Sequence, residues 1–311
     1  MEPLDLGTLP TPVEPAPRLA TALGLEPDDL WVKRDDLFGL GGGGNKIRKL
    51  RHTGAEALAQ GARVLVTTGA AQSNHARLTA AVGARLGLDV ELVLAGTADA
   101  ATTGNLLLDH LFGARLVWAG VVPHEELEQV AAERVSTLDA EGTPAYQVPY
   151  GGSSVTGARG YVDAGLELVE QVPDVRHVVV ALGSGGTAAG LVAALGTSRV
   201  LAVDTGATAD PAERTSRLVE GLGGDAQGLR LRRDLVGDGY STLPEPVHDA
   251  LLLTARTEGI VLDPVYTGRA MAGLVAAVRE GDVRRGERTV FMHTGGLPGV
   301  FGSTALAGRL A

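Results

Sequence analysis

Three lysines, Lys33, Lys46 and Lys49, lie within one short segment of this chain, and the other basic residues, out of 27 in all, are arginines. An arginine side chain keeps its proton in a protein and so cannot form an imine with an aldehyde, whereas a lysine amine can. A Schiff-base function would therefore have to lie in this segment. The alternative interpretation is an arginine-biased composition in which three lysines remain by chance.

The segment WVKRDDLFGLGGGGNKIRKL predicts a short strand, a glycine-rich loop and a helix that begins near Asn45. Lys46 then falls in the first helical turn, where the helix dipole and partial burial both lower the pKa of its amine from the usual value of about 10.4. Lys49 and Arg48, in the next turn, could supply charge to a phosphate. Solvated basic residues after a glycine-rich connection are the alternative.

The stretch VVVALGSGGTAAGLVAALG predicts a strand, a turn and a helix, and it could bind either of two ligands. Gly183 and Gly185 match a dinucleotide-binding fingerprint, with Asp204 at the end of the next strand. The residues from Ser184 to Thr187 equally present backbone amides and two hydroxyls at a helix N-terminus, which can cradle a single phosphate. A tight turn that uses glycine only for packing is the third interpretation.

The stretch AAQSNHARL places Gln72, Ser73 and Asn74 just after a predicted strand, at the start of a helix. Ser73 could simply be the N-cap of that helix. In the functional interpretation, the free amides of the helix start bind a substrate carboxylate. Asn74 then hydrogen-bonds the ring oxygen of a cofactor, and Ser73 relays a proton.

Two tyrosines and a threonine are further candidates. Tyr240 and Tyr266 each lie beside glycine or proline in a turn, from which a ring can approach a ligand, although tyrosines more often serve in packing. Thr294 ends an apolar strand just before two glycines, where its hydroxyl could face a cofactor ring nitrogen. The adjacent His293 has neither the histidine spacing nor the nearby acids of a metal site, so we expect no metal.

The elements that must position these residues follow a βα rhythm. Short apolar runs alternate with longer helical patterns, and the runs lack polar alternation, which is typical of a parallel, doubly wound sheet covered on both faces. In such sheets the ligand lies at the carboxyl ends of the strands. The runs lie in residues 62–70, 90–96, 114–120, 177–186, 199–206 and 288–296.

The length of 311 residues exceeds that of one compact domain, so we expect an α/β protein with two lobes. The predicted larger lobe comprises residues 1–50 and 155–311, and the smaller one residues 51–154.

The absence of cysteine excludes disulfides, thiolate metal sites and a cysteine nucleophile. A net charge of −10 argues against nucleic acid. Without a leader-like or membrane-spanning segment, we expect a cytoplasmic protein that acts on small molecules.

Six motifs occur in order: GGGGNKIRKL, QSNH, GSGGT, GDGY, DPVYTGRAMAGL and HTGG. Together they resemble the D-cysteine desulfhydrase and 1-aminocyclopropane-1-carboxylate deaminase family of fold type II pyridoxal-phosphate enzymes. The resemblance implies two-lobed, mostly parallel sheets like those of the tryptophan synthase β-subunit, a homodimer, and a Schiff base between Lys46 and the cofactor. It implies catalytic roles for Lys46, Ser73, Tyr240 and Tyr266. The cofactor-binding residues that we expect are Lys46, Lys49, Asn74, Gly183, Ser184, Gly185, Gly186, Thr187 and Thr294. The substrate-binding residues that we expect are Gln72, Ser73, Asn74, Tyr240 and Tyr266.

Two positions discriminate within this family. Deaminases of the cyclopropane substrate resemble VYEG, with a glutamate that pairs with the pyridine nitrogen, and have leucine before the final glycine pair, whereas this chain has Thr267 and Thr294. A neutral hydroxyl should make the cofactor a weaker electron sink, which suits β-elimination of a good leaving group such as thiolate. The pattern therefore resembles the desulfhydrase branch, with D-cysteine as substrate.

Other functions stay open at this point. Within the same chemistry, L-cysteate or 1-aminocyclopropane-1-carboxylate could be the substrate. A nucleotide-binding oxidoreductase would instead use Gly183, Gly185 and Asp204, and it would not need Lys46. A non-catalytic binding module would take up amino acids without turnover.

Overall fold

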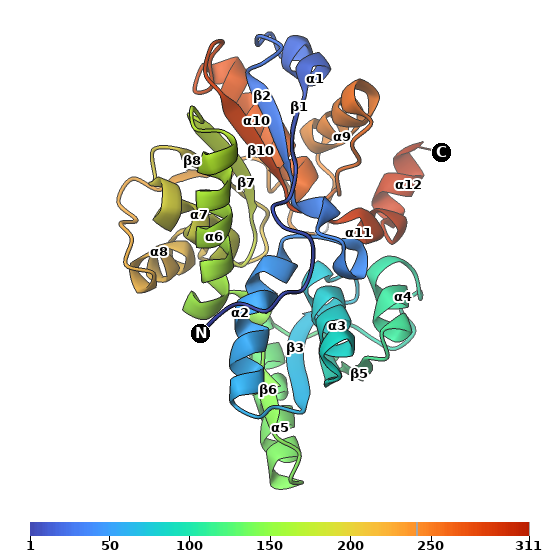
Figure 1. Ribbon diagram of the computed structural model, residues 1–311. Coiled ribbons are helices and arrows are strands. Elements are labelled where there is room, and N and C mark those ends of the chain that lie inside the picture. The colour runs from blue at the N-terminus through green and yellow to red at the C-terminus, as the bar shows by residue number, and fades with distance from the viewer. Residues whose placement is uncertain (241, 311) are drawn as a thin grey trace.

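The computed structural model describes residues 1–240 and 242–310, which form two sheets with helices packed on both faces of each (Figure 1). All neighbouring strands run parallel except β1, which pairs antiparallel with β2. The larger sheet has, in spatial order, β1 (Val13–Pro15), β2 (Leu30–Arg34), β10 (Thr289–His293), β7 (His177–Leu182), β8 (Val200–Asp204) and β9 (Arg230–Arg232). The smaller sheet has β5 (Arg115–Trp118), β4 (Asp89–Ala95), β3 (Val64–Ala70) and β6 (Ala145–Gln147).

The helices lie on defined faces of these sheets. On the larger sheet, α1 (Pro17–Ala22), α9 (Glu245–Glu258) and α10 (Thr267–Glu280) cover one face. The opposite face carries α6 (Val155–Gln171), α7 (Gly186–Leu195) and α8 (Pro211–Gly221). On the smaller sheet, α2 (Lys46–Ala59), α3 (Asn74–Leu86) and α4 (Gly104–Leu111) cover one face and α5 (His124–Ala140) the other. The remaining elements are η1 (Asp35–Leu37), η2 (Leu40–Gly42), η3 (Tyr150–Gly152), α11 (Leu297–Phe301) and α12 (Thr304–Leu310).

Strand β7 shows why the apolar runs form buried parallel strands. Successive side chains point to opposite faces, so Val178 and Val180 pack against α6 and α7, while Val179 and Ala181 face α10. Full burial of a valine side chain contributes roughly 1.5–3 kcal/mol to the free energy of folding, and side chains on both faces of β7 are buried in this way. A continuous apolar run is therefore what this position requires.

The predicted α/β class with mostly parallel sheets is confirmed, and each of the six apolar runs contains a strand. The sequence patterns did not indicate β1, β6 and β9, which have three residues each and no apolar run. The division into lobes stays a prediction: its boundary after residue 50 falls inside α2. In the described part of the chain, no helix is both long and apolar enough to cross a membrane.

Candidate active site

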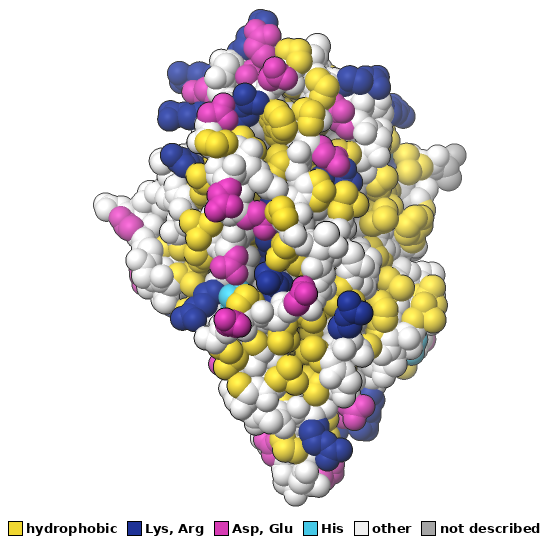
Figure 2. Space-filling view, in the orientation of Figure 1, with side chains coloured by type: hydrophobic (Ala, Val, Ile, Leu, Met, Phe, Trp, Pro, Cys, Tyr) yellow, Lys and Arg dark blue, Asp and Glu magenta, His cyan; other side chains and the backbone are white. Residues whose placement is uncertain are grey.

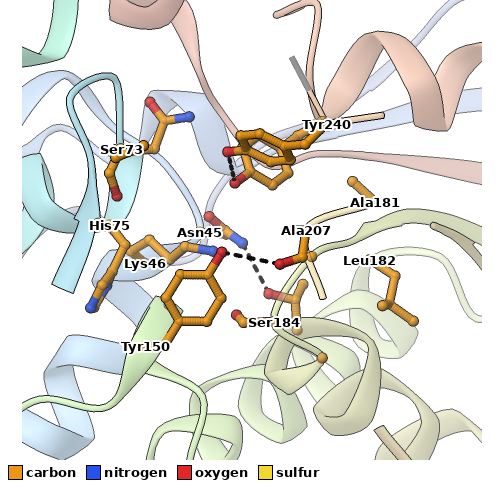
Figure 3. A pocket seen from close by; sticks show the side chains of 18 of the residues that line it. Asn45, Lys46, Ser73, His75, Tyr150, Ala181, Leu182, Ser184, Ala207 and Tyr240 are labelled. Atoms are coloured by element: carbon orange, nitrogen blue, oxygen red, sulfur yellow. Dashed lines mark hydrogen bonds between the residues drawn. The ribbon is translucent and has the colours of Figure 1, made fainter. Parts of the chain in front are cut away.

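A cavity of about 460 Å³ lies where the carboxyl ends of strands from both sheets meet. Its walls come from the carboxyl ends of β3, β4 and β7, from the segments that follow β8 and β10, and from the first turns of α2, α3 and α7, as expected for parallel sheets. Figure 3 shows Lys46, Ser73, Tyr150, Ser184 and Tyr240 around the same space. The predicted site residues that line it are Lys46, Lys49, Ser73, Asn74, Gly183, Ser184, Gly185, Thr187, Tyr240, Tyr266 and Thr294.

Lys46 is the first residue of α2, and its half-buried side chain faces the cavity. Removal from water lowers the pKa of its amine to about 8, although the carboxylate of Asp263 opposes part of that shift. At pH 7 about one such amine in ten is then neutral, against about one in a few thousand for an ordinary lysine. The cavity therefore holds an amine with a substantial nucleophilic fraction.

The glycine-rich loop fixes the start of α2 against the larger sheet. The backbone N–H of Asn45 donates to Thr294 O at 2.9 Å, and that of Gly44 donates to Asp35 O at 3.0 Å. Gly43 has a φ of +72°, and a Cβ at this position would lie 1.8 Å from Asp36 O. Only glycine allows this close approach of two backbone segments.

A group of hydrogen-bond donors surrounds the N-terminus of α7. The Lys49 amine donates to Ser153 Oγ at 2.9 Å and to Gly151 O at 3.1 Å, and Ser153 Oγ lies 2.7 Å from Ser184 Oγ. Ser153 Oγ also accepts the N–H of Gly186 at 3.1 Å, so Gly186 belongs to this group although it does not line the cavity. The hydroxyl of Thr187 accepts the side-chain amide of Asn45 at 2.9 Å, which leaves its own proton free.

These donors fit an anion. Burial lowers the pKa of Lys49 well below its usual value, and the positive charges of Lys46 and Arg214 lower it further. Within the described residues, no carboxylate bonds to the Lys49 amine. A buried amine, a helix N-terminus and several hydroxyls are the partners that a phosphate group prefers. The site therefore suits the phosphorylated aldehyde cofactor that the resemblance implies.

The start of α3 forms another wall. Ser73 is its N-cap, and its Oγ accepts the N–H of Ala76 at 3.1 Å, so the hydroxyl proton remains available to a ligand. Asn74 lines the cavity, but Gln72 does not. The amide of Gln72 instead donates to Thr103 O at 3.0 Å and accepts the N–H of Asn105 at 2.9 Å. Its geometry gives no support to the predicted role in substrate binding.

Tyr240 and Tyr266 come together at the cavity, with 2.5 Å between their hydroxyl oxygens and their rings edge to face. Burial raises the pKa of both phenols, and for Tyr266 the neighbouring Tyr240 raises it further. Both hydroxyls therefore keep their protons at neutral pH and can donate hydrogen bonds. The backbone of Tyr266 is held by Asp263, whose Oδ2 accepts its N–H at 2.9 Å.

Of the two threonines that were to discriminate within the family, only Thr294 lines the cavity. The interpretation of Thr267 as a group facing the cofactor ring is wrong. Its hydroxyl is fully buried, accepts the N–H of Asp263 at 2.8 Å and donates to Asp263 Oδ1 at 2.6 Å. At the first position of α10, this side chain turns back onto the preceding loop, while the neighbouring Tyr266 enters the cavity.

The expectation that Arg48 supplies charge to a phosphate is also wrong. Its guanidinium is buried behind α2, where it bonds Asp35 at 2.9 Å and Glu167 at 2.9 Å. The acid of the nucleotide fingerprint, Asp204, does not line the cavity either. Its carboxylate accepts the N–H of Gly206 at 2.9 Å and lies 3.4 Å from the Arg233 guanidinium.

Four polar cavity residues were not predicted: Asn45, His75, His124 and Tyr150. Burial lowers the pKa of His75, so its imidazole is neutral, and its Nε2 lies 2.8 Å from Thr67 Oγ1. Tyr150 precedes Gly151 in a turn, so the criterion that selected Tyr240 and Tyr266 would have found it too.

Comparison with known proteins gives consistent results. The chain matches the sequence model of a family described as pyridoxal-phosphate dependent enzyme over residues 4–295. It is 38% identical to a D-cysteine desulfhydrase of Klebsiella pneumoniae strain 342, over 96% of this chain and 95% of that protein. A crystal structure titled as an ACC deaminase homologue is 36% identical, with a TM-score of 0.89 over 96% of this chain and 93% of that one. Maize serine racemase, 20% identical over 92% and 88% of the two chains, shares the fold with a TM-score of 0.64.

Proposed function

The chain belongs to the pyridoxal-phosphate-dependent enzyme family, as its motifs predict, and on this premise we propose that it is a lyase. Its substrate is a small β-substituted amino acid, with D-cysteine as the first candidate. Water and D-cysteine would yield pyruvate, ammonia and hydrogen sulfide. The observation that carries the proposal is the Lys46 amine, which faces the cavity with a pKa of about 8.

The cofactor would be bound at four points. Lys46 binds its aldehyde, and Lys49 with the α7 N-terminus from Ser184 to Thr187 binds its phosphate. Asn74 contacts the ring oxygen, and Thr294 the ring nitrogen. When bound, pyridoxal phosphate supplies an electron sink for the bonding pair that remains at the substrate α-carbon after its proton leaves.

The substrate would lie between α3 and the tyrosine pair. The α3 N-terminus and the Ser73 hydroxyl bind its carboxylate, since free backbone amides at a helix start favour an anion. The Lys46 amine would accept the α-proton. Tyr266, which keeps its proton at neutral pH, donates to the departing sulfur, and Tyr240 hydrogen-bonds the Tyr266 oxygen.

The choice of D-cysteine rests on the similarity to D-cysteine desulfhydrases over nearly the whole chain. Thr294 supports it, because a hydroxyl leaves the ring nitrogen without an anionic partner, and thiolate is a good leaving group. Thr267 does not contribute to this choice. The solved ACC deaminase homologue keeps 1-aminocyclopropane-1-carboxylate as an alternative substrate, and L-cysteate is another.

The cofactor assignment is tested by the near-visible absorbance of the purified protein, with and without added pyridoxal phosphate. We expect a yellow band, its absence in Lys46→Ala, and, after borohydride reduction, a modified peptide that contains Lys46. Lys33→Ala is the matched control, since Lys33 is buried away from the cavity, and it should keep the band in any folded preparation. A wild-type protein that stays colourless with the cofactor would contradict the proposal.

The substrate assignment is tested with a panel of D-cysteine, L-cysteine, L-cysteate and 1-aminocyclopropane-1-carboxylate. Pyruvate with sulfide from D-cysteine is the expected result. Pyruvate with sulfite would identify L-cysteate, and 2-oxobutyrate would identify the cyclopropane substrate. If the protein is yellow but turns over none of these compounds, the cofactor assignment stands and the proposed reaction is refuted.

The division into lobes of residues 1–50 with 155–311 and 51–154, the cytoplasmic location and the homodimer also remain proposals. The homodimer is supported by an exposed apolar surface. Figure 2 shows apolar side chains along the edge where α4, α11 and α12 lie. The members of this surface are Leu107, Leu111, Leu297, Phe301 and Leu310.

A further inference from the structure

We propose that Arg77 and Asn105 are positioning residues that orient the side-chain amide of Asn74, so that its nitrogen and not its oxygen faces the cavity. The pair fixes Asn74 as a hydrogen-bond donor before any ligand arrives. Its use toward the ring oxygen of pyridoxal phosphate rests on the proposed function. The orientation itself rests only on the hydrogen bonds of these three side chains.

The direction of the network is set at Arg77, because a guanidinium can only donate hydrogen bonds. Arg77 is fully buried on α3, one turn after Asn74. Its Nε donates to Asn105 Oδ1 at 3.0 Å, and its Nη2 donates to Asn74 Oδ1 at 3.4 Å. Both amide oxygens must therefore point toward the guanidinium.

The orientation of the Asn105 side-chain amide is fixed in the same way, because its oxygen accepts a hydrogen bond from Arg77. With its oxygen committed to Arg77, its Nδ2 is the donor on the opposite side, and it donates to Gln72 O at 2.9 Å and to Asn74 Oδ1 at 3.1 Å. The side chain of Asn105 is fully buried on α4, and Gln72 also accepts its backbone N–H. Gln72, outside the cavity, thus helps to hold the residue that orients Asn74.

Asn74 Oδ1 consequently receives two donors, from Arg77 and from Asn105. An amide that was turned around would place its own N–H groups against these donors, so the turned form is excluded. Asn74 lines the cavity, and its Nδ2 is left as the polar atom available to a ligand. A fixed donor suits a ring oxygen that carries negative charge.

Composition supports a functional need for these amides. The whole chain has three asparagines, Asn45, Asn74 and Asn105. Asn45 and Asn74 line the cavity, and Asn105 bonds directly to Asn74. Arg77 adds a link to the loop before Lys46, since its Nη1 donates to Gly41 O and Gly43 O. The network therefore joins the Asn74 side chain to the loop that positions the lysine.

The sharpest test is Asn105→Asp, which keeps the size of the side chain and its contact with Arg77. Its second carboxylate oxygen would face Asn74 Oδ1 at the place of the 3.1 Å bond from Asn105. This repulsion outweighs the longer 3.4 Å bond from Arg77, so the Asn74 amide turns and presents its oxygen to the cavity. A donor on the ring oxygen weakens proton binding to the lysine-bound cofactor. Its loss should raise the pH midpoint of the cofactor absorbance by about one unit, the size expected for a hydrogen bond to a charged group.

Asn74→Asp is the reference variant and should shift the midpoint in the same direction. Gln227→Glu makes the same amide-to-acid change at an exposed position outside the cavity, and it should match the wild type. If Asn105→Asp does not fold, Asn105→Ala removes the same donor without adding a charge and should raise the midpoint less. A folded Asn105 variant with the wild-type midpoint, beside a shifted Asn74→Asp, would overturn the positioning role and leave the proposed function intact.

A second readout needs no cofactor. Protein labelled with [15N]asparagine gives three side-chain amide signals, one for each asparagine of the chain. In cofactor-free Asn105→Asp, the Asn74 signal should move because its N–H groups now donate to the new carboxylate, while the Asn45 signal stays. Two unchanged signals would overturn the proposed network, whatever the cofactor proves to be.

Discussion

The three lysines of the chain differ in their partners. The Lys33 amine donates to Glu167, to Gln171 Oε1 at 2.6 Å and to Thr11 O at 2.8 Å. Lys46 and Lys49, by contrast, lie at the cavity, and within the described residues neither amine bonds to a carboxylate. A buried amine without a bonded anion loses its proton more easily. The environment thus separates one structural lysine from two that can serve a ligand.

At the residue scale, Tyr266→Phe removes the hydroxyl assigned to the leaving group. Turnover should fall by about 10²-fold or more, the usual contribution of a positioned acid, while the cofactor absorbance stays unchanged. Tyr146→Phe is the matched control, because its hydroxyl bonds Glu56 and its ring does not line the cavity. Steady-state kinetics with both variants decide the matter, and equal turnover in the two would remove Tyr266 from the mechanism.

Asp109 is a buried carboxyl on α4, and neither of its oxygens has a hydrogen-bond partner among the residues that the structure describes. Burial raises its pKa to about 7, against the opposing charge of Arg77. Because the folded state binds the proton more tightly than the unfolded state, the stability due to this group is present below pH 4 and lost as the pH rises to 7.

Asp109→Asn removes this dependence. Relative to the variant, the wild type should lose up to about 4 kcal/mol of unfolding free energy between pH 4 and pH 8, the equivalent of three pKa units. Urea unfolding of both proteins at several pH values measures the difference. Parallel curves across this range would show that the carboxyl is ionised at an ordinary pH in the folded protein.

At the scale of elements, the start of α2 depends on the crossing of the glycine loop over η1. Gly43→Ala adds a Cβ that would lie 1.8 Å from Asp36 O, so the loop must move. We expect a loss of more than about 3 kcal/mol in unfolding free energy, with weaker cofactor binding.

Gly24→Ala is the control for backbone strain alone. Gly24 has a similar φ of +80°, but apart from its two chain neighbours no described residue has an atom within 4 Å of the added Cβ. The left-handed conformation by itself should cost about 1–2 kcal/mol, measured by denaturant unfolding. Equal losses in the two variants would mean that the close approach at Gly43 has no energetic weight.

At the scale of the whole molecule, two sheets meet with their strand ends around one cavity, and α4, α11 and α12 present an apolar surface beside it. Leu111 and Phe301 on this surface are 70% and 75% exposed. Large exposed apolar patches mark protein contacts, and the proposed homodimer would bury this one.

The double variant Leu111→Glu, Phe301→Glu should therefore shift a dimer to a monomer near 31.9 kDa in light scattering after size exclusion. Leu166→Glu, at an exposed position on α6, is the control and should stay dimeric. A wild-type protein that elutes as a monomer at micromolar concentration would refute the proposed assembly.

Local sequence determined the parallel βα framework and the lysine at a helix start, because apolar runs, glycine turns and capping residues act through near neighbours in the chain. Tertiary structure decided which side chains share the cavity. The Arg48 side chain points away from the cavity because it bonds to Glu167. That partner lies 119 residues away in the sequence, so the contact exists only in the folded chain. Asn74 is a fixed donor because Asn105 reaches it from a separate helix. The direction of a side chain in a loop or first helical turn is set by contacts between distant segments, which spacing along the sequence does not encode.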